Sequence, residues 1–251
     1  MKYFFPVILV LLQFFESPAL MAQRPKELEN SATYMEQAQD IASGAYRFIG
    51  NARFKREGAI MYCDSAYWYG NRNFLEAFSR VHLVQGDSID LYGDYLTYDD
   101  NTRLAQISGN VRLVGRNTEL VTTELEFNVG TSTAYYTKHA DIKSGENKLK
   151  SEKGYYYSRS ETYYFEDSVV LENPDYTIYS DTLRYVTPTK VAYFYGPTEI
   201  IGDSSYIYCE DGWYNTETDV SMLKQHALVQ NKNQSIRGDS LYYERNTGIG
   251  L

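Results

Sequence analysis

The feature that most constrains this chain is a pattern that recurs every 29 residues over most of its length. Four columns of residues follow this spacing, and each keeps its apolar or aromatic character from copy to copy. The columns are Leu91, Leu120, Leu149, Ile178, Ile207 and Ile236; Tyr98, Phe127, Tyr156, Tyr185, Tyr214 and Tyr243; Leu113, Ile142, Leu171, Ile200 and Val229; and Ile107, Tyr136, Phe165, Phe194 and Leu223. A fixed period of this length is typical of proteins in which each repeat stacks on the next. The unbroken register therefore predicts one repeat domain and not two ordinary domains.

Each repeat contains short segments in which apolar and polar residues alternate, as in strands with one buried face. Within residues 93–122 these segments are Tyr95–Tyr98, Arg103–Ile107, Val111–Val114 and Thr118–Thr122. The polar turn Asp99–Thr102 has the composition of a β-hairpin, which implies antiparallel neighbours. The brief Gly109-Asn110 bend is typical of a corner between two sheets. We therefore predict an all-β fold, an elongated, open-edged β-jelly-roll of about 29-residue repeats with two facing antiparallel sheets.

Composition agrees with an all-β chain and argues against one class of partner. Tyrosine accounts for 26 of the 251 residues, and aromatic residues favour strands. The formal net charge of −9 gives the surface no general attraction for phosphate backbones. We therefore expect no nucleic acid as a partner.

The first 22 residues have the parts of a secretory signal peptide. Lys2 provides a positive charge, residues 4–15 form an apolar run, and small residues follow up to Ala22. A membrane anchor is the alternative, but the run is shorter than the roughly 20 residues that a spanning helix needs. We predict a signal peptide over 1–22 and a segment over 23–43 that is either a degenerate first strand or a short capping helix. The repeat domain then covers 44–251, and its last repeat is incomplete at Leu251.

The two cysteines occupy the same position of the repeat, five copies apart. Stacked strands about 4.8 Å apart would place Cys63 and Cys209 at least about 24 Å from each other. A disulfide requires about 7 Å or less between Cα atoms. Two free thiols are therefore expected.

An acidic residue recurs beside the bends and invites a catalytic or metal-binding interpretation. The residues are Asp64, Asp94, Glu152, Asp181, Glu210 and Asp239. A carboxylate beside a bend can instead accept a backbone N–H, and one copy carries Thr123 at this position, which fits capping better than a ladder of metal sites. The histidines and cysteines have no zinc spacing, and there is no Ser/His/Asp grouping or Gly-rich phosphate loop. We therefore predict no enzyme activity, no metal and no cofactor.

Five lysines form a basic run in an otherwise acidic chain: Lys138, Lys143, Lys148, Lys150 and Lys153. The simplest interpretation is a solvated face. The alternative is contact with the phosphates of an anionic ligand or a membrane surface.

The inward-pointing apolar residues of the repeat are the remaining candidates for a binding site. They are Ile107, Leu113, Leu120, Ile142, Leu149, Phe165, Leu171, Ile178, Phe194, Ile200, Ile207, Leu223, Val229 and Ile236. If the two sheets close, these side chains form a dry core, whereas sheets that splay apart would leave a long apolar trough. Such a trough could hold lipid chains, at about 0.8 kcal/mol per buried methylene.

Two stretches of the chain carry a recognisable unit: GDYLTYDDNTRLAQISGNVRLVGRNTELVT (93–122) and SDTLRYVTPTKVAYFYGPTEIIGDSSYIY (180–208). The unit consists of an acidic residue, alternating apolar positions, a turn rich in Asp and Asn, and a strand that opens with Gly-Asn-Val. In this it resembles the OstA-like family, to which LptA, LptC and the N-terminal domain of LptD belong. The resemblance covers about residues 45–251.

The resemblance implies a slender periplasmic jelly-roll whose interior carries the lipid A acyl chains of lipopolysaccharide between membranes. By position, the inward residues named above would line that path. Tyr136, Tyr156 and Tyr185 depart from the family pattern, because smaller aliphatic residues would leave more room.

The partners implied by the resemblance are lipopolysaccharide and other OstA-like domains joined end to end. These domains would belong to an inner-membrane export complex, an outer-membrane translocon or further copies of this chain. The implied location is the periplasm, with association at the outer membrane left open. The alternative function is a structural or adhesive β-repeat protein with a filled core.

Overall fold

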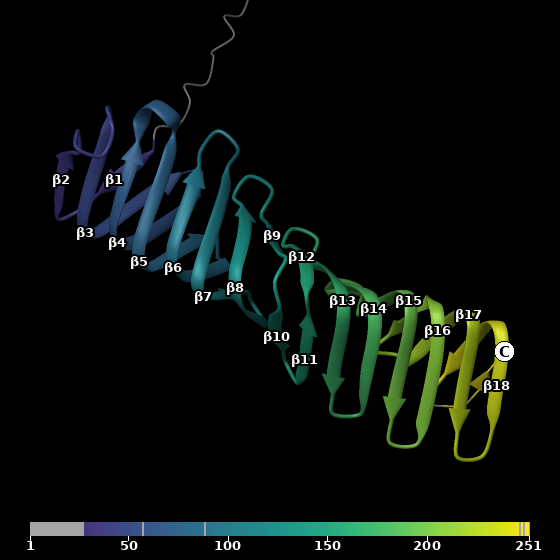
Figure 1. Cartoon of the computed structure of the whole chain (residues 1–251). Coiled ribbons are helices and arrows are strands. Elements are labelled where there is room, and N and C mark those ends of the chain that lie inside the picture. Colours follow the sequence, from purple (N-terminus) through teal and green to yellow (C-terminus); the bar gives the residue numbers. More distant parts are fainter. Residues whose placement is uncertain (1–27, 57, 88, 246, 248, 251) are drawn as a thin grey trace, which may run out of the picture.

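The protein is an elongated stack of antiparallel strands (Figure 1). The structure, a computed structural model, describes residues 28–56, 58–87, 89–245, 247 and 249–250, so the predicted signal peptide lies outside the described residues. The strands are β1 Glu29–Ser31, β2 Tyr34–Gln37, β3 Ala45–Arg56, β4 Ala59–Tyr69, β5 Phe74–Gln85, β6 Ile89–Asp99, β7 Leu104–Val114, β8 Thr118–Asn128, β9 Thr133–Tyr136, β10 Ala140–Ser144, β11 Asn147–Ser151, β12 Lys153–Tyr157, β13 Thr162–Asn173, β14 Tyr176–Val186, β15 Val191–Gly202, β16 Ser205–Asn215, β17 Val220–Asn231, β18 Ser235–Glu244 and β19 Ile249–Gly250. Two short 3₁₀ turns, η1 Gly70–Arg72 and η2 Thr187–Thr189, complete the described elements. In the part of the chain that the structure describes, no helix is long and apolar enough to span a bilayer.

The long strands bend halfway, and this turns one hydrogen-bonded ladder into two facing layers. In β7 the pairing with β8 shifts between Ser108 and Val111. Gly109 and Asn110 take up the bend with φ values of 75° and 47°, a region that glycine enters without steric cost. A Cβ atom at Gly109 would also collide with the Asp94 carboxylate. The segments predicted on either side of this bend are therefore two halves of one strand.

The two layers enclose one continuous apolar core. We call the layer that contains 95–99, 104–108 and 124–128 the first layer, and the layer that contains 89–93, 111–114 and 118–122 the second layer. Alternate side chains of both layers point inward and are buried along the whole stack. The layers are joined along the bends. On the opposite side the hairpin loops of the two layers face each other, and we call this side the mouth.

The N-terminal segment continues the stack as strands. β1 pairs with the second-layer half of β3, and β2 pairs with its first-layer half. Leu28 packs against the core. Of the two alternatives for this segment, the described residues therefore adopt the degenerate strand and not the capping helix.

One repeat in the middle of the stack is interrupted. β9 and β10 take the places of the two halves of one bent strand, pairing with the first-layer and second-layer halves of β8 respectively. β11 and β12 replace the next strand in the same way. Figure 1 shows these short strands between the longer ones on either side. The bend is therefore a break at this repeat, as it also is between β1 and β2 at the N-terminal end of the described residues.

Candidate functional site

The candidate residues of the second layer form one uninterrupted ladder. Leu113 pairs across strands with Leu120, and Leu120 pairs in turn with Ile142. The series continues, each residue pairing with the next, through Leu149, Leu171, Ile178, Ile200, Ile207, Val229 and Ile236. All are buried except Leu171 and Ile236, which are half-buried against the core. Equivalent positions of the repeat therefore stack directly on one another.

The candidate residues of the first layer face this ladder from the other side. Ile107, Phe165, Phe194 and Leu223 are all buried. Their cross-strand neighbours form a further column at the same spacing, which the sequence analysis missed: Leu96, Leu125, Gly154, Leu183, Gly212 and Leu241. The signal was present, but two glycines interrupt its apolar character. At Gly154 the Tyr136 hydroxyl occupies the space that a Cβ would fill.

A small apolar crevice lies between the two layers in the middle of the stack. Five candidate residues line it: Ile142, Leu149, Phe165, Leu171 and Ile178. The remaining lining comes from Tyr163, Tyr176, Tyr185, Ala192, Thr118, Ser144, Asn147 and Thr216. Its volume is about 50 Å³, whereas a single water needs about 10–15 Å³. An acyl chain could enter only if the layers moved apart.

Polar contacts join the two layers across the mouth in the N-terminal part of the stack. Arg56, at the end of the second layer, lies with its Nη2 3.0 Å from Asp100 Oδ2 in a first-layer loop. Gln85, one repeat further on, donates its Nε2–H to the Val129 carbonyl at 2.7 Å. The mouth is therefore held shut over these repeats.

The crevice begins at the next contact of this kind. The Tyr163 hydroxyl donates to Thr118 Oγ1 at 3.1 Å, from the first layer to the second. Burial raises the pKa of Tyr163 far above its usual value, so the hydroxyl stays protonated and remains a donor. On the other side of the crevice, the rings of Tyr176 and Tyr214 meet edge to face at 5.8 Å. Between these contacts the mouth is lined mainly by apolar side chains.

Tyr163 is the functional candidate that sequence reasoning missed. From β7 onward its column consists otherwise of small residues: Ala105, Ala134, Ala192 and Ser221. The bulky side chain stacks on its cross-strand neighbour Tyr156, with ring centroids 4.4 Å apart. A tyrosine at a repeat position that mostly holds small residues was the signal that could have revealed it.

The architecture described above has a counterpart among known families. The sequence model of a family described as OstA-like protein matches residues 27–181, more than half of the chain. The chain belongs to the OstA-like family. This confirms the resemblance stated from the repeat units, and the structure confirms the all-β repeat fold.

Among solved structures, this OstA-like chain is similar to the crystal structure of LptH from Pseudomonas aeruginosa. That protein is described as the LptA homologous periplasmic component of the conserved lipopolysaccharide transport device. The identity is 16%, and the match covers 55% of this chain and 82% of LptH with a TM-score of 0.26. A TM-score this low supports no conclusion about this chain. The comparison with curated proteins finds no match.

The acidic residues beside the bends bind side chains across the corner. Asp94 accepts a hydrogen bond from Asn110 Nδ2 at 2.6 Å, and Asp64 accepts one from Arg80 Nε at 2.8 Å. The prediction named a backbone N–H as donor, whereas these donors are side chains of the neighbouring strand. Their role is therefore local to the corner, with side-chain donors in place of the predicted backbone N–H.

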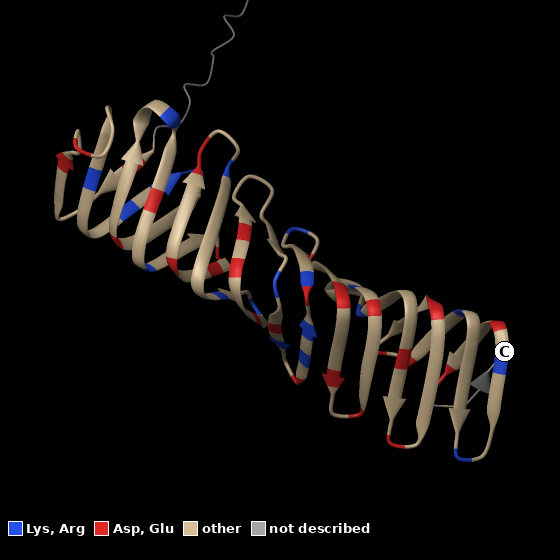
Figure 2. Ribbon diagram, viewed as in Figure 1, with Lys and Arg blue, Asp and Glu red and all other residues tan. Residues whose placement is uncertain are grey.

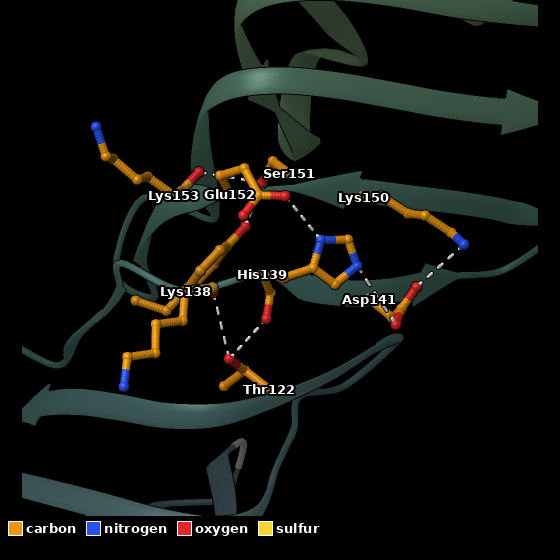
Figure 3. A network of polar contacts seen from close by, with 9 residues as sticks. Thr122, Lys138, His139, Asp141, Lys150, Ser151, Glu152 and Lys153 are labelled. Atoms are coloured by element: carbon orange, nitrogen blue, oxygen red, sulfur yellow. Dashed lines mark hydrogen bonds and ion pairs between the residues drawn. The ribbon is translucent and has the colours of Figure 1, made fainter.

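At the interrupted repeat a histidine occupies the corner (Figure 3). His139 Nδ1 lies 3.1 Å from Glu152 Oε1, and its Nε2 lies 3.7 Å from Asp141 Oδ2. Thr122 donates its hydroxyl to the His139 carbonyl at 2.9 Å. These contacts join β8, β10 and the β11–β12 break. Among the described residues, no three His, Cys, Asp or Glu side chains are grouped as a metal site.

The basic run lies on the same short strands, where Figure 2 shows Lys and Arg gathered. Three of its lysines have carboxylate partners: Lys138 with Glu124 at 2.7 Å, Lys150 with Asp141 at 3.5 Å and Lys153 with Asp167 at 2.7 Å. Much of the positive charge is therefore compensated locally.

Both cysteines are buried and unpaired, which confirms the prediction of two free thiols. Burial raises the pKa of Cys63 to about 11 and that of Cys209 to about 12. Both thiols are therefore protonated at neutral pH and are poor nucleophiles.

Proposed function

We propose that this protein binds lipopolysaccharide in the periplasm by taking the acyl chains of lipid A between its two layers, and that it passes the lipid from one membrane toward the other. The observation that carries this proposal is the crevice, an apolar space at the mouth that opens onto an uninterrupted ladder of aliphatic side chains. Membership of the OstA-like family supports it. The inward residues hold the ligand by burial alone, and no bond is made or broken.

The free energies involved allow the crevice to open. Separating Tyr163 from Thr118 breaks one neutral hydrogen bond, which contributes about 0.5–1.5 kcal/mol. Each methylene that enters the space contributes about 0.8 kcal/mol. A few buried methylenes therefore outweigh the loss of this contact, and a full acyl chain outweighs it many times over.

The regular ladder gives the path its continuity. Successive ladder positions are Leu or Ile over most of the stack, so a chain that moves along meets the same surface at each step. Within the described residues, β1 and β2 pair on one side only. Because unpaired strand edges are pairing surfaces, another OstA-like domain would extend the path at this end.

Site-specific photo-crosslinking tests the proposal. A photoreactive phenylalanine in place of Leu171, which is half-buried and lines the crevice, should form adducts with lipopolysaccharide in living cells. The matched control is the same residue in place of Glu172, the exposed neighbour that points outward. Adducts at both positions, or at neither, would contradict an interior path.

A structural β-repeat protein with a filled core is the second candidate. The observation in its favour is the tight packing of β3–β8, where Leu91, Leu96 and Phe127 are each 0% exposed. If this candidate were right, depleting the protein would leave lipopolysaccharide display at the cell surface unchanged, and Leu171 would give no lipid adducts.

A further inference from the structure

A second hollow lies on the outside of the first layer, on the face opposite the core. It is a groove of about 290 Å³ over β7 and β8. We call it the outer groove, and its outward-facing lining includes Tyr95, Thr97, Gln106, Glu124, Glu126 and Tyr135. It continues past Glu126 and Tyr135 into a neighbouring hollow of about 550 Å³ that reaches Tyr155 and Tyr157. None of these outward side chains takes part in the interior path.

Two aromatic rings form the walls of the outer groove, and each is backed by a second ring. Tyr95 in β6 packs against Phe78 at 5.2 Å on the side away from the groove. Tyr135 in β9 stacks on Tyr155 of β12, with centroids 4.3 Å apart and planes 21° apart. The other face of each ring is left for the groove. β6 and β9 are three strand spacings apart, so the walls stand about 14 Å from each other.

The Tyr95 wall is also fixed through its hydroxyl. That hydroxyl donates to Glu76 Oε1 at 3.0 Å, and burial together with this carboxylate raises the pKa of Tyr95 to about 12. The other Glu76 oxygen accepts a hydrogen bond from the Tyr69 hydroxyl at 2.6 Å. The wall is therefore held in place before any ligand arrives, which lowers the entropy cost of binding.

The floor of the outer groove is polar and close to neutral. Gln106 donates its Nε2–H to Glu126 Oε1 at 3.0 Å, which leaves the Gln106 carbonyl oxygen and the second Glu126 oxygen as acceptors. The charge of Glu124 is paired with Lys138 at 2.7 Å. The floor therefore offers acceptors for hydroxyl groups and a small negative charge.

We infer that the outer groove binds a neutral saccharide chain. A sugar ring has C–H groups on its faces, which pack on aromatic rings, and hydroxyls on its edge, which bond to amide and carboxylate oxygens. Walls of tyrosine with a floor of Gln106 and Glu126 match both properties at once. The adjoining hollow, with its row of tyrosines, provides the same surface for further sugar units.

Other ligand classes fit this geometry less well. A cation bound by aromatic rings must lie within about 6 Å of each ring centroid, and walls about 14 Å apart cannot both reach one ammonium group. An acidic saccharide would be repelled by Glu126. A purely apolar ligand would cover the floor acceptors without bonding to them.

This inference goes beyond the proposed function, because the outer groove and the crevice lie on opposite faces of the first layer. The saccharide could be the sugar portion of the lipid that the interior carries or a free glycan. The two sources share one chemistry, and the probes below separate them.

Titration calorimetry tests the inference with four probes: the neutral outer-chain polysaccharide of lipopolysaccharide, freed of lipid A and of its acidic core sugars, neutral dextran, spermidine and lipid A. The wild-type protein should bind at least one saccharide. Binding of the released polysaccharide alone assigns the site to the carried lipid, and binding of dextran as well assigns it to neutral glycans in general. Lipid A should bind equally to every variant, so a loss of lipid A binding would count against the interior path and not against the outer groove.

The variants attribute the binding to the outer groove. Tyr135→Ala should weaken saccharide binding at least tenfold, whereas Tyr135→Phe, which keeps the ring, should retain it. Gln106→Ala removes an exposed floor residue without touching the core and should weaken binding severalfold. Tyr179→Ala, on the outer face of the second layer and 46% exposed, is the matched control and should bind as wild type does. Two results would overturn the inference directly: no saccharide binds to the wild-type protein, or Tyr135→Ala binds saccharide as tightly as the wild type does. The inference also fails if Tyr135→Ala loses binding of spermidine but of no saccharide.

Discussion

The stack from β3 to β8 and the region from β10 to β14 are built from the same repeat, yet only the second contains the crevice. Both have the same second-layer ladder, in which Leu91 pairs with Leu113 and Leu171 pairs with Ile178. Leu91 is fully buried, whereas Leu171 is half-buried and lines the crevice. An apolar ladder thus serves equally as core or as cavity wall, and other residues decide between the two.

Those other residues stand at the mouth and at the corner. Over β3–β8 the mouth is closed by charged and amide side chains, as in the pair Arg56–Asp100. At the crevice the layers are joined by the neutral contact between Tyr163 and Thr118 and by the long, exposed ion pair between Arg116 and Glu161. The neighbouring strands β9–β12 also break at the corner. The weakest closure and the least continuous strands therefore fall in the same part of the molecule.

The largest expected effect contrasts two leucines of the ladder. Leu91→Ala empties a closed core and should lower the free energy of unfolding by about 2–5 kcal/mol. Leu171→Ala widens a space that is already open and should cost about 1 kcal/mol. Urea titrations of both variants measure the difference. Equal losses would mean that the crevice is as well packed as the rest, and the comparison drawn above would fail.

A smaller effect is expected from two arginines at the mouth. Arg56 and Asp100 have side chains only 18% and 13% exposed, so Arg56→Met leaves a half-buried carboxylate without this partner. We expect a loss of about 1–3 kcal/mol. Arg116 reaches Glu161 at 4.0 Å with a side chain 73% exposed, and Arg116→Met should cost less than about 0.5 kcal/mol. Thermal unfolding of the two variants side by side provides the measurement.

The contrast between the arginines also has a ligand readout. Opening the mouth over β3–β8 should extend the apolar path toward the N-terminal end. Arg56→Met is therefore expected to allow lipid adducts from a photoreactive residue at Leu83, which lines a narrow hollow there. Adducts at Leu83 in the unsubstituted protein would show that this part of the mouth is not closed.

The stacking within each layer could be predicted from sequence because it follows the repeat. Residues 29 apart occupy alternate strands of the same layer, so the ladder through Leu120, Leu149 and Ile178 was visible as a column. The corner at Gly109-Asn110 could be predicted because glycine and asparagine enter the positive-φ region most readily, whereas the equivalent pairs Ser79-Arg80, Asp167-Ser168 and Gln225-His226 give no such signal.

The contacts across the mouth could not be predicted in this way. Arg56 and Asp100 are 44 residues apart in the sequence, and Thr118 and Tyr163 are 45 apart. Neither separation equals one or two periods of the repeat. A repeat reveals which residues stack within a layer, but the offset between layers depends on strand tilt and on the break at β9–β12. The outer groove could not be predicted for a related reason. The alternation of apolar and polar residues places Tyr95 and Tyr135 on the outer face, but it does not indicate that they line the same groove across two strands.

The smallest effect concerns the two thiols, which occupy equivalent corners on either side of the crevice. Burial raises the pKa of Cys63 from about 9 to about 11, so at pH 8 the folded protein should hold roughly 100-fold less Cys63 thiolate than the unfolded chain. The folded state holds this proton more tightly than the unfolded chain does. The ionisation therefore leaves the free energy of unfolding unchanged below pH 9 and lowers that free energy as the pH rises from 9 toward 11.

The labelling rates of the two thiols provide the measurement. Ellman's reagent applied to Cys63→Ser and Cys209→Ser measures each remaining thiol alone, and both should label slowly until urea unfolds the chain. If the crevice opens locally, Cys209 in β16 should label no faster than Cys63 in β4. Much faster labelling of Cys209 would show that the whole C-terminal stack loosens, and the crevice would then be one sign of a general weakness and not a separate site.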